Sequence, residues 1–295
     1  MIKRTIDISE PGYLHVQHRQ LCVDRDDETV ARVPVEDLAV LVLANPAIVI
    51  TQAVIALCQQ HNVAILFCDE KHLPISVTLP LWGGHSLHAK VLRAQISITE
   101  PTRKRLWREI VQAKITQQIV TLERAGVGAP GLGRLRANVK SADPSNCEAQ
   151  AARQYWRALM GETFRRDSEA GGINNLLNYG YAVMRAMIAR AIVGTGLHPA
   201  LGLHHKNQYN GLCLADDLME PLRPWVDWEV FKMTRGGRAP AIDRASKQVL
   251  LGLLASDARL DERVMPLMVA SHSMAAGLKA AMTEKLRLSF PARVH

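Results

Sequence analysis

Hydrophobic residues in the first 80 positions occur in short runs that are separated by polar residues and turns. The runs lie at 13–17, 20–23, 29–33, 39–43 and 63–68. Each run is rich in β-branched types, which is typical of β-strands. In residues 51–61, by contrast, Val54, Ile55, Leu57 and Cys58 recur at helical spacing. We therefore expect one helix within a β-rich region.

The pattern changes to helical spacing beyond Gly83 and Gly84, which we interpret as a linker. Residues 101–124 keep apolar side chains in steps of three to five, which predicts a helix of about 20 residues. The positions are Leu106, Ile110, Ile115, Ile119 and Leu122. Further helices are predicted at 148–161, 174–194, 217–233, 241–256 and 260–282. Residues 125–142 and the pair Gly236–Gly237 are predicted to be flexible.

These two patterns predict an α+β fold, in which a small β-rich domain (residues 1–82) precedes a larger all-helical domain (residues 83–295). The chain is 48% hydrophobic and 22% charged, as expected of a globular protein. Its five cysteines include no Cys-x-x-Cys pair, so we expect neither a disulfide framework nor a structural zinc site, and the compartment expected is the reducing cytoplasm. No stretch has the roughly 18 apolar residues of a membrane span, so no membrane partner is expected.

The formal net charge of +8 is unevenly distributed along the chain. Residues 1–90 contain seven Lys and Arg against ten Asp and Glu, a net charge of −3, which leaves +11 for the other 205 residues. Basic residues neutralise phosphates, so this excess favours nucleic acid as the partner. Ordinary solubility, with basic residues spread over a solvated surface, accounts for the charge equally well.

Three short segments combine residue types that can carry out chemistry. Residues 145–148 (SNCE) open one predicted helix, residues 202–207 (GLHHKN) form a loop, and residues 215–221 (ADDLMEP) open another helix. Carboxylates from the two helices and an imidazole from the loop can converge on one divalent cation, for which magnesium or manganese is suitable. Three acids in the third segment, Asp216, Asp217 and Glu220, would also repel one another without a cation.

The same acids can be interpreted as helix caps. Ser145 and Glu148 have the spacing of a capping box, and Asp217 and Glu220 resemble one with an aspartate cap. Each glutamate would then only accept a hydrogen bond from a backbone amide. Spacing alone favours capping, whereas the apolar helix face that follows Glu148 favours an inward-pointing acid.

Four ordered segments resemble the successive motifs of CRISPR-associated protein 1, the integrase of CRISPR adaptation. They are residues 145–156 (SNCEAQAARQYW), 174–181 (NNLLNYGY), 201–207 (LGLHHKN) and 214–224 (LADDLMEPLRP). The resemblance covers nearly the whole chain, including the order of a β domain and a helical domain. The compact length and the His-His-Lys-Asn segment are similar to the type II branch of the family.

The resemblance implies a catalytic metal triad of Glu148, His205 and Glu220 that binds Mg²⁺ or Mn²⁺. Asp217 corresponds to the family's neighbouring acid, either a ligand or a group that supports one. Aligning Gly202 with the glycine three places before the family's ligand selects His205 over His204. The basic residues that we expect to bind DNA are Arg103, Lys104, Arg105, Arg108, Lys206 and Arg223.

The resemblance also implies the reaction and the assembly. The protein would join the 3′-hydroxyls of spacer DNA to repeat ends by transesterification, as a metal-dependent integrase and endonuclease. It would form homodimers that flank a dimer of CRISPR-associated protein 2 in a heterohexamer on double-stranded DNA, with further type II subunits. The alternatives are a non-catalytic DNA-binding architectural protein and a metal-dependent nuclease without strand-transfer activity.

The β domain is expected to mediate dimerisation and to dock the partner subunit. It is net acidic, contains none of the candidate chemical segments, and can bury only part of its apolar strands because small domains hide a lower fraction of their surface. The competing interpretation is that these strands pack onto the helical domain of the same chain.

Overall fold

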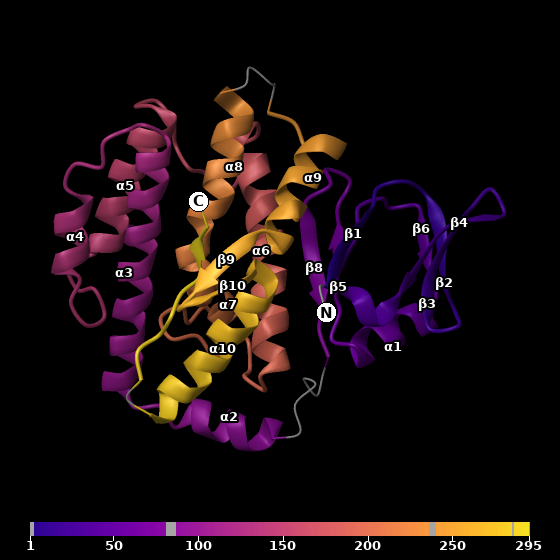
Figure 1. Ribbon diagram of the computed structural model, residues 1–295, viewed down its shortest axis with the longest axis horizontal. Helices are drawn as coiled ribbons and strands as arrows, with labels where there is room; N and C mark the ends of the chain where they lie inside the picture. Colours follow the sequence, from indigo (N-terminus) through magenta and orange to yellow (C-terminus); the bar gives the residue numbers. More distant parts are fainter. Residues whose placement is uncertain (1–2, 81–86, 236–239, 285, 295) are drawn as a thin grey trace.

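The computed structural model describes residues 3–80, 87–235, 240–284 and 286–294. Figure 1 shows the β-rich region beside a larger helical region, in the order that the sequence predicts. The predicted α+β class is therefore confirmed. The linker at Gly83–Gly84 and the pair Gly236–Gly237 lie outside the described residues.

The β-rich region contains two four-stranded sheets. The first has the order β1-β5-β7-β8, in which β1, β5 and β7 are parallel and β8 is antiparallel. Its strands are β1 (Arg4–Ile8), β5 (Leu38–Leu43), β7 (Ala64–Cys68) and β8 (Pro74–Thr78). All six residues of β5 are buried, as expected of a central strand covered on both faces.

The second sheet has the order β4-β3-β2-β6 and lies farther from the helical region (Figure 1). Its strands are β2 (Gly12–Gln17), β3 (Gln20–Arg25), β4 (Glu28–Pro34) and β6 (Ile48–Ile50). The 3-10 helix η1 (Val35–Asp37) and helix α1 (Gln52–Gln60) complete this part of the chain. Leu14, Leu41 and Val54 belong to one buried cluster, so the two sheets and α1 share a core.

The other face of the first sheet packs against the helical region. Val40, Val42 and Leu66 belong to the same buried cluster as Met184 and Ile188 of helix α6 (Ile173–Gly194). Reciprocal hydrogen bonds between Asn62 and Arg190 reinforce this contact. The β strands therefore do pack onto the helical domain of their own chain, as the competing interpretation predicted for part of their apolar surface.

Helix α6 is the central element of the helical region, with 15 of its 22 residues buried. The helices are α2 (His88–Ile96), α3 (Glu100–Arg124), α4 (Leu132–Asn138), α5 (Cys147–Met160), α6 (Ile173–Gly194), α7 (Cys213–Met219), η2 (Glu220–Leu222), α8 (Arg223–Arg235), α9 (Arg244–Gly252), η3 (Leu253–Ala255) and α10 (Leu267–Thr283). Gly180 permits close contact between α6 and α8, because a Cβ atom there would lie 2.4 Å from Cγ1 of Val226. None of the described helices is long and apolar enough to cross a membrane.

Several boundaries differ from those predicted. The helix expected at 217–233 is divided into α7, η2 and α8. The segment 125–142 was expected to be flexible but contains α4. Helix α2 was not predicted. The helical domain also contains a small sheet of order β10-β9-β11, so it is not all-helical. Its strands are β9 (Asp257–Leu260), β10 (Arg263–Pro266) and β11 (Ala292–Arg293). Ala258 and Leu260 alternate with exposed residues at strand spacing, and α10 begins only at Leu267.

Candidate functional site

Glu148 lies in the first turn of α5, and a residue upstream of the predicted box caps this helix. The carboxylate of Asp143 accepts hydrogen bonds from the backbone N–H groups of Cys147 and Glu148, both at 2.9 Å. The capping box expected from Ser145 and Glu148 is therefore wrong. The Glu148 side chain is free to point away from its own helix end, and its Oε1 accepts a hydrogen bond from Nζ of Lys114 at 2.7 Å.

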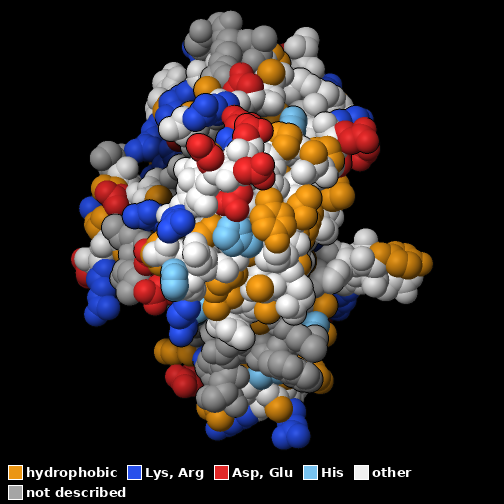
Figure 2. Space-filling view, turned by 90° about the vertical axis from the view of Figure 1, so that its right-hand side faces the viewer, with side chains coloured by type: hydrophobic (Ala, Val, Ile, Leu, Met, Phe, Trp, Pro, Cys, Tyr) orange, Lys and Arg blue, Asp and Glu red, His pale blue; other side chains and the backbone are white. Residues whose placement is uncertain are grey.

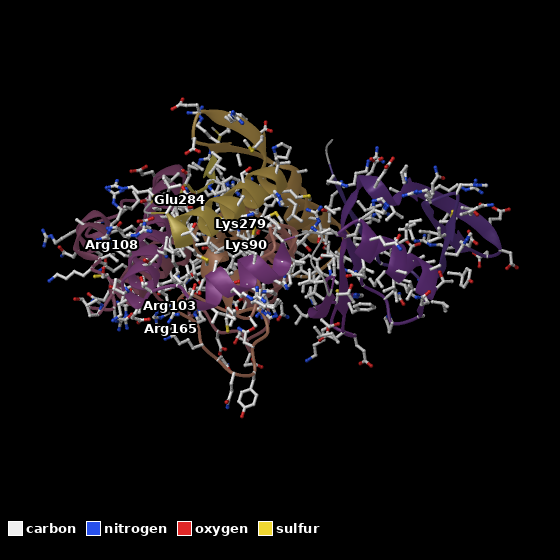
Figure 3. The ribbon with its side chains drawn as sticks, turned by 90° about the horizontal axis from the view of Figure 1, so that it is seen from below. Lys90, Arg103, Arg108, Arg165, Lys279 and Glu284 are labelled. Carbon is white, nitrogen blue, oxygen red and sulfur yellow. The ribbon has the colours of Figure 1, made fainter. Side chains whose placement is uncertain are left out.

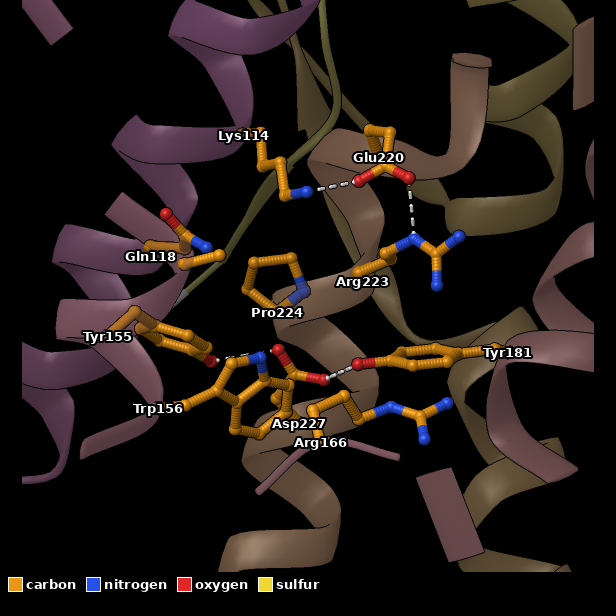
Figure 4. A pocket seen from close by; sticks show the side chains of 11 residues that line it. Lys114, Gln118, Tyr155, Trp156, Arg166, Tyr181, Glu220, Arg223, Pro224 and Asp227 are labelled. Atoms are coloured by element: carbon orange, nitrogen blue, oxygen red, sulfur yellow. Dashed lines mark hydrogen bonds and ion pairs between the residues drawn. The ribbon is translucent and has the colours of Figure 1, made fainter. Parts of the chain in front are cut away.

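Glu220 opens η2 and is almost completely buried, with 5% of its surface exposed. Arg223 Nε donates to its Oε1 at 2.8 Å, and Lys114 Nζ lies 2.5 Å from its Oε2 (Figure 4). Burial alone would raise the pKa of Glu220, but Arg223 and Lys114 lower it to about 2. The acid is thus ionised at neutral pH. Its partners are side chains, so the expected role in a cap is wrong.

Lys114 of α3 is the residue that joins the two glutamates, and the sequence interpretation did not include it. Its ammonium contacts both carboxylates while only 9% of the residue is exposed. Burial would lower the pKa of Lys114, but Glu220 and Glu148 raise it above its ordinary value. The signal in the sequence was its position four residues after Ile110, where a charged residue interrupts the buried face of a helix.

His205 is positioned by Asp217, which is fully buried. Oδ1 of Asp217 lies 2.6 Å from Nδ1 of His205, and the carboxylate also accepts hydrogen bonds from the backbone N–H groups of Leu203, His204 and His205. The hydrogen bond to Asp217 raises the pKa of His205 above its ordinary value. Asp217 therefore orients the imidazole and leaves its Nε2 atom available to a ligand.

His204 has a different environment from its neighbour. Its ring stacks on Trp107 of α3, with 4.2 Å between the ring centroids and an interplanar angle of 4°. Gly202 makes this tight loop possible, because a Cβ atom there would lie 2.4 Å from the carbonyl oxygen of His205 and 2.9 Å from Oδ2 of Asp217. The two histidines are thus held at an edge-to-face angle by the same loop.

The expected repulsion among Asp216, Asp217 and Glu220 is absent, because each acid has donors of its own. Arg185 donates to both oxygens of Asp216 at 2.7 and 2.8 Å. Asp217 is satisfied by the loop around His205, and Glu220 by Arg223 and Lys114. Mutual repulsion of these acids therefore gives no argument for a bound cation.

Glu148, Glu220 and His205 nevertheless form one electrostatic group. Lys114 links the two glutamates, and Glu220 raises the pKa of His205 through their charge interaction. Within the described ranges, no three His, Cys, Asp or Glu side chains are arranged to hold a metal ion. The buried Oε2 of Glu220 pairs with Lys114 but makes no hydrogen bond of ordinary geometry. It is an anionic oxygen that a cation can bind.

A cavity of about 150 Å³ adjoins Glu220 (Figure 4). On its wall, the buried Asp227 accepts hydrogen bonds from the hydroxyl groups of Tyr155 and Tyr181. Burial raises the pKa of Asp227 to about 7, although the hydrogen bonds from the tyrosines lower it. The guanidinium of Arg223 packs over the Tyr181 ring, 4.7 Å from its centroid, so this network supports the arginine that holds Glu220.

The basic residues predicted to bind DNA divide into two groups. Arg103, Lys104, Arg108 and Lys206 are exposed or partly exposed, and Figure 3 shows Arg103 and Arg108 in the helical region, seen from below. Arg105 instead donates to Glu109 and to the carbonyls of Ala281 and Leu286. Arg223 is engaged by Glu220. Arg105 and Arg223 thus have partners within the chain, and DNA binding by any of the six residues stays a prediction.

Known proteins share the sequence pattern and the fold of this chain. A family model described as CRISPR associated protein Cas1 matches residues 7–259. A CRISPR-associated endonuclease Cas1 from Neisseria meningitidis serogroup C is 36% identical over 288 residues, which cover 97% of this chain and 94% of the relative. A Cas1 endonuclease from Saccharolobus solfataricus is 26% identical over 79% of this chain and 76% of the relative.

Solved structures share the fold at lower sequence identity. A casposase bound to its integration product superposes with a TM-score of 0.79 at 19% identity, covering 97% of this chain and 92% of that chain. A Cas1 protein from Thermotoga maritima gives a TM-score of 0.73 at 16% identity and covers 97% of this chain and 99% of its own. The protein therefore has the fold of these Cas1 and casposase structures. The chain belongs to the Cas1 family, as its motifs predicted.

Proposed function

We propose that this protein is a metal-dependent DNA integrase and endonuclease of CRISPR adaptation, which joins the 3′-hydroxyls of spacer DNA to repeat ends by transesterification. The observation that carries the proposal is that Lys114 joins the carboxylates of Glu148 and Glu220, while His205, which Asp217 orients, interacts with Glu220 through charge. Relatives named as Cas1 endonucleases support the reaction class. A non-catalytic architectural protein would have no need of this buried ionised group.

Mg²⁺ or Mn²⁺ suits the donors, since two carboxylates and one imidazole are hard or intermediate ligands. Glu148, Glu220 and Nε2 of His205 would hold the ion, whereas Asp217 has its oxygens occupied by the loop and serves as a positioning residue. When bound, the cation would polarise the attacked phosphodiester and stabilise the leaving oxygen. Arg223 keeps Glu220 ionised, and Asp217 keeps His205 in a fixed orientation.

No covalent protein nucleophile is required by this reaction, because a DNA hydroxyl attacks the phosphodiester directly. The task left to the chain is to hold the two DNA ends in line and to neutralise their phosphates. Arg103 and Arg108, which are partly exposed, and Lys206, which is exposed, suit this task. They lie on the elements that carry the site: Arg103 and Arg108 on α3, and Lys206 in the loop of His205. Arg103, His205 and Lys206 line one groove.

The strand-transfer assay tests the proposal and its choice of histidine. A labelled short duplex and a plasmid that carries a repeat are incubated with the protein, with and without the Cas2 subunit. Glu148→Gln or His205→Ala should abolish joining, whereas His204→Ala should only weaken it because His204 is stacked on Trp107. Full activity of folded Glu148→Gln in magnesium or manganese would exclude the assignment. Cleavage without joining by the unchanged protein would favour the nuclease alternative.

The assembly that we propose is a homodimer that binds double-stranded DNA and a Cas2 dimer in a heterohexamer, with further type II subunits, in the cytoplasm. The second sheet (β4-β3-β2-β6), the outer sheet of the β domain, supports a role of this domain in dimerisation. Tyr13 and Val49 are paired on adjacent strands and are 46% and 57% exposed. Figure 2 shows hydrophobic and acidic side chains together on the side of the molecule where this domain lies, which suits a protein contact better than a DNA contact.

Dimerisation through the outer sheet predicts the effect of a single charge. Val49→Lys should convert the dimer to a monomer, as measured by light scattering after size exclusion. Ile75→Lys is the matched control, because Ile75 is 69% exposed but belongs to the other sheet. A Val49→Lys protein that remains dimeric would remove the outer sheet from the interface.

A further inference from the structure

The ammonium of Lys114 occupies the space between the two carboxylates that would bind a metal ion. It lies 2.7 Å from Oε1 of Glu148 and 2.5 Å from Oε2 of Glu220. A magnesium ion that bound these two oxygens would lie about 2.0–2.1 Å from each. Two like charges cannot share the same oxygens at contact distance without strong repulsion. The lysine and a metal ion therefore exclude one another from this position.

We propose that Lys114 is an internal counter-cation, which holds the two carboxylates together in the metal-free protein and moves into the adjoining cavity when a divalent cation binds. This inference rests on the proposed function, because the ion is the one required there. In this view the metal affinity depends on Lys114 as well as on the residues that bind the ion.

The cavity beside Lys114 has both the room and the acceptors for the displaced ammonium. Its volume of about 150 Å³ is several times the roughly 30 Å³ that a water molecule occupies in the liquid. Gln118 lies one turn after Lys114 on α3 and lines the same cavity (Figure 4). It is only 2% exposed, and its buried Oε1 has no hydrogen-bond partner among the described residues.

The carboxylate of Asp227 provides a second destination on the same cavity wall. It already interacts electrostatically with Lys114, which lowers the pKa of Asp227. An ammonium that leaves Glu148 and Glu220 would thus remain near the carboxyl group of Asp227 and gain the unpaired oxygen of Gln118. The exchange requires the flexible Lys114 side chain to swing into the cavity and the Gln118 amide, whose nitrogen is turned towards the cavity in Figure 4, to rotate so that its oxygen meets the ammonium.

The inference predicts the effect of removing the lysine on metal affinity. Lys114→Met keeps the length of the side chain and removes its charge. If the lysine blocks the site nine-tenths of the time, the variant should bind Mn²⁺ about tenfold more tightly, because the apparent affinity scales with the fraction of open sites. Free Mn²⁺ is measured by electron paramagnetic resonance in titrations of the full-length chain. Lys232→Met, which removes a lysine from the far part of α8, is the control and should bind as the unchanged protein does.

A second variant tests the movement into the cavity. Gln118→Met removes the unpaired acceptor, so it should weaken Mn²⁺ binding in the chain that contains Lys114 and have no effect in the chain with Lys114→Met. Thermal unfolding gives an independent measurement. Without metal, Lys114→Met should melt at a lower temperature, because Glu148 and Glu220 face each other without the lysine, and Mn²⁺ should restore more stability to it than to the unchanged protein.

The outcomes separate the inference from the proposed function. Equal or weaker Mn²⁺ binding by Lys114→Met overturns the inference alone, provided that Glu148→Gln abolishes binding. An equal effect of Gln118→Met in both backgrounds overturns the movement into the cavity. Failure of every variant and of the unchanged chain to bind Mn²⁺ overturns both the inference and the metal-dependent function.

Discussion

Asp227→Asn should make the protein more stable, by an amount that depends on pH. Asp227 is 2% exposed and lies between Tyr155 and Tyr181, whose hydroxyl groups both donate to it. Burial raises its pKa from 3.8 to about 7, so the fold disfavours the ionised carboxylate. Asparagine has nearly the same shape and can still bond to both hydroxyl groups, but it carries no charge.

The sign and size of the effect follow from proton linkage. Because the pKa of Asp227 is higher in the folded than in the unfolded chain, the folded protein binds this proton more tightly, and its free energy of unfolding falls as the pH rises from 3.8 towards 7. At about 1.4 kcal/mol per pH unit, the loss between pH 5 and pH 7 is about 2 kcal/mol. Above pH 7 the loss is complete and the difference between the two proteins becomes constant.

Urea unfolding followed by tryptophan fluorescence measures this difference at pH 5, 6, 7 and 8. The advantage of Asp227→Asn over the unchanged chain should grow up to pH 7 and then level off. Asp257→Asn, at an exposed position, is the control for loss of a carboxylate. A constant difference at all four pH values would refute the reasoning. An advantage that shrinks with rising pH would show that Arg223 and the tyrosines stabilise the anion more than burial destabilises it.

Two further predictions concern packing and DNA binding. Gly180→Ala should lower the free energy of unfolding by about 1–3 kcal/mol, and with it the melting temperature, because the new Cβ atom would collide with Val226. Gly277→Ala is the control and should not change the melting temperature, since no atom of the described residues outside its own helix lies within 4 Å of its Cβ position. Stable packing of Gly180→Ala would show that α6 and α8 can separate freely. Arg108→Ala should reduce the slope of the logarithm of duplex affinity against the logarithm of salt concentration by about one, as expected for the loss of one phosphate contact. Arg32→Ala, on the acidic β domain, should leave this slope unchanged. Equal effects of the two arginine substitutions would remove the preference for the helical region.

The sequence predicted best those helices in which one buried face repeats apolar residues at helical spacing. Helices α3, α5 and α6 lie within a residue or two of their expected bounds, because each has a continuous apolar face. Helix α10 begins later than expected, since Ala258 and Leu260 follow strand spacing just before it and apolar content alone could not distinguish the two. Helix α4 was missed because glycine and basic residues surround its few apolar positions.

The sequence drew attention to the acids and histidines of the candidate site, but not to the residues that hold them in place. The acids and histidines were found from their motifs, but the partners that fix them come from distant parts of the chain. Lys114 lies 34 residues before Glu148, a separation that no local pattern connects. Asp143 was missed as the cap of α5, since the intervening Asn146 in a left-handed conformation moves the capping acid outside the usual box. The family motifs therefore singled out these residues, and only the tertiary fold shows what each one contacts.

The sheet that covers α6 has a consequence for how the protein unfolds. One face of β5 and β7 belongs to the same core as α6, so part of the hydrophobic interior continues across the boundary near residue 82. Removing the β strands would expose the central helix, which α7, α8 and α10 contact. We therefore expect a weakened strand in this sheet also to loosen the helices that position Glu148, His205 and Glu220.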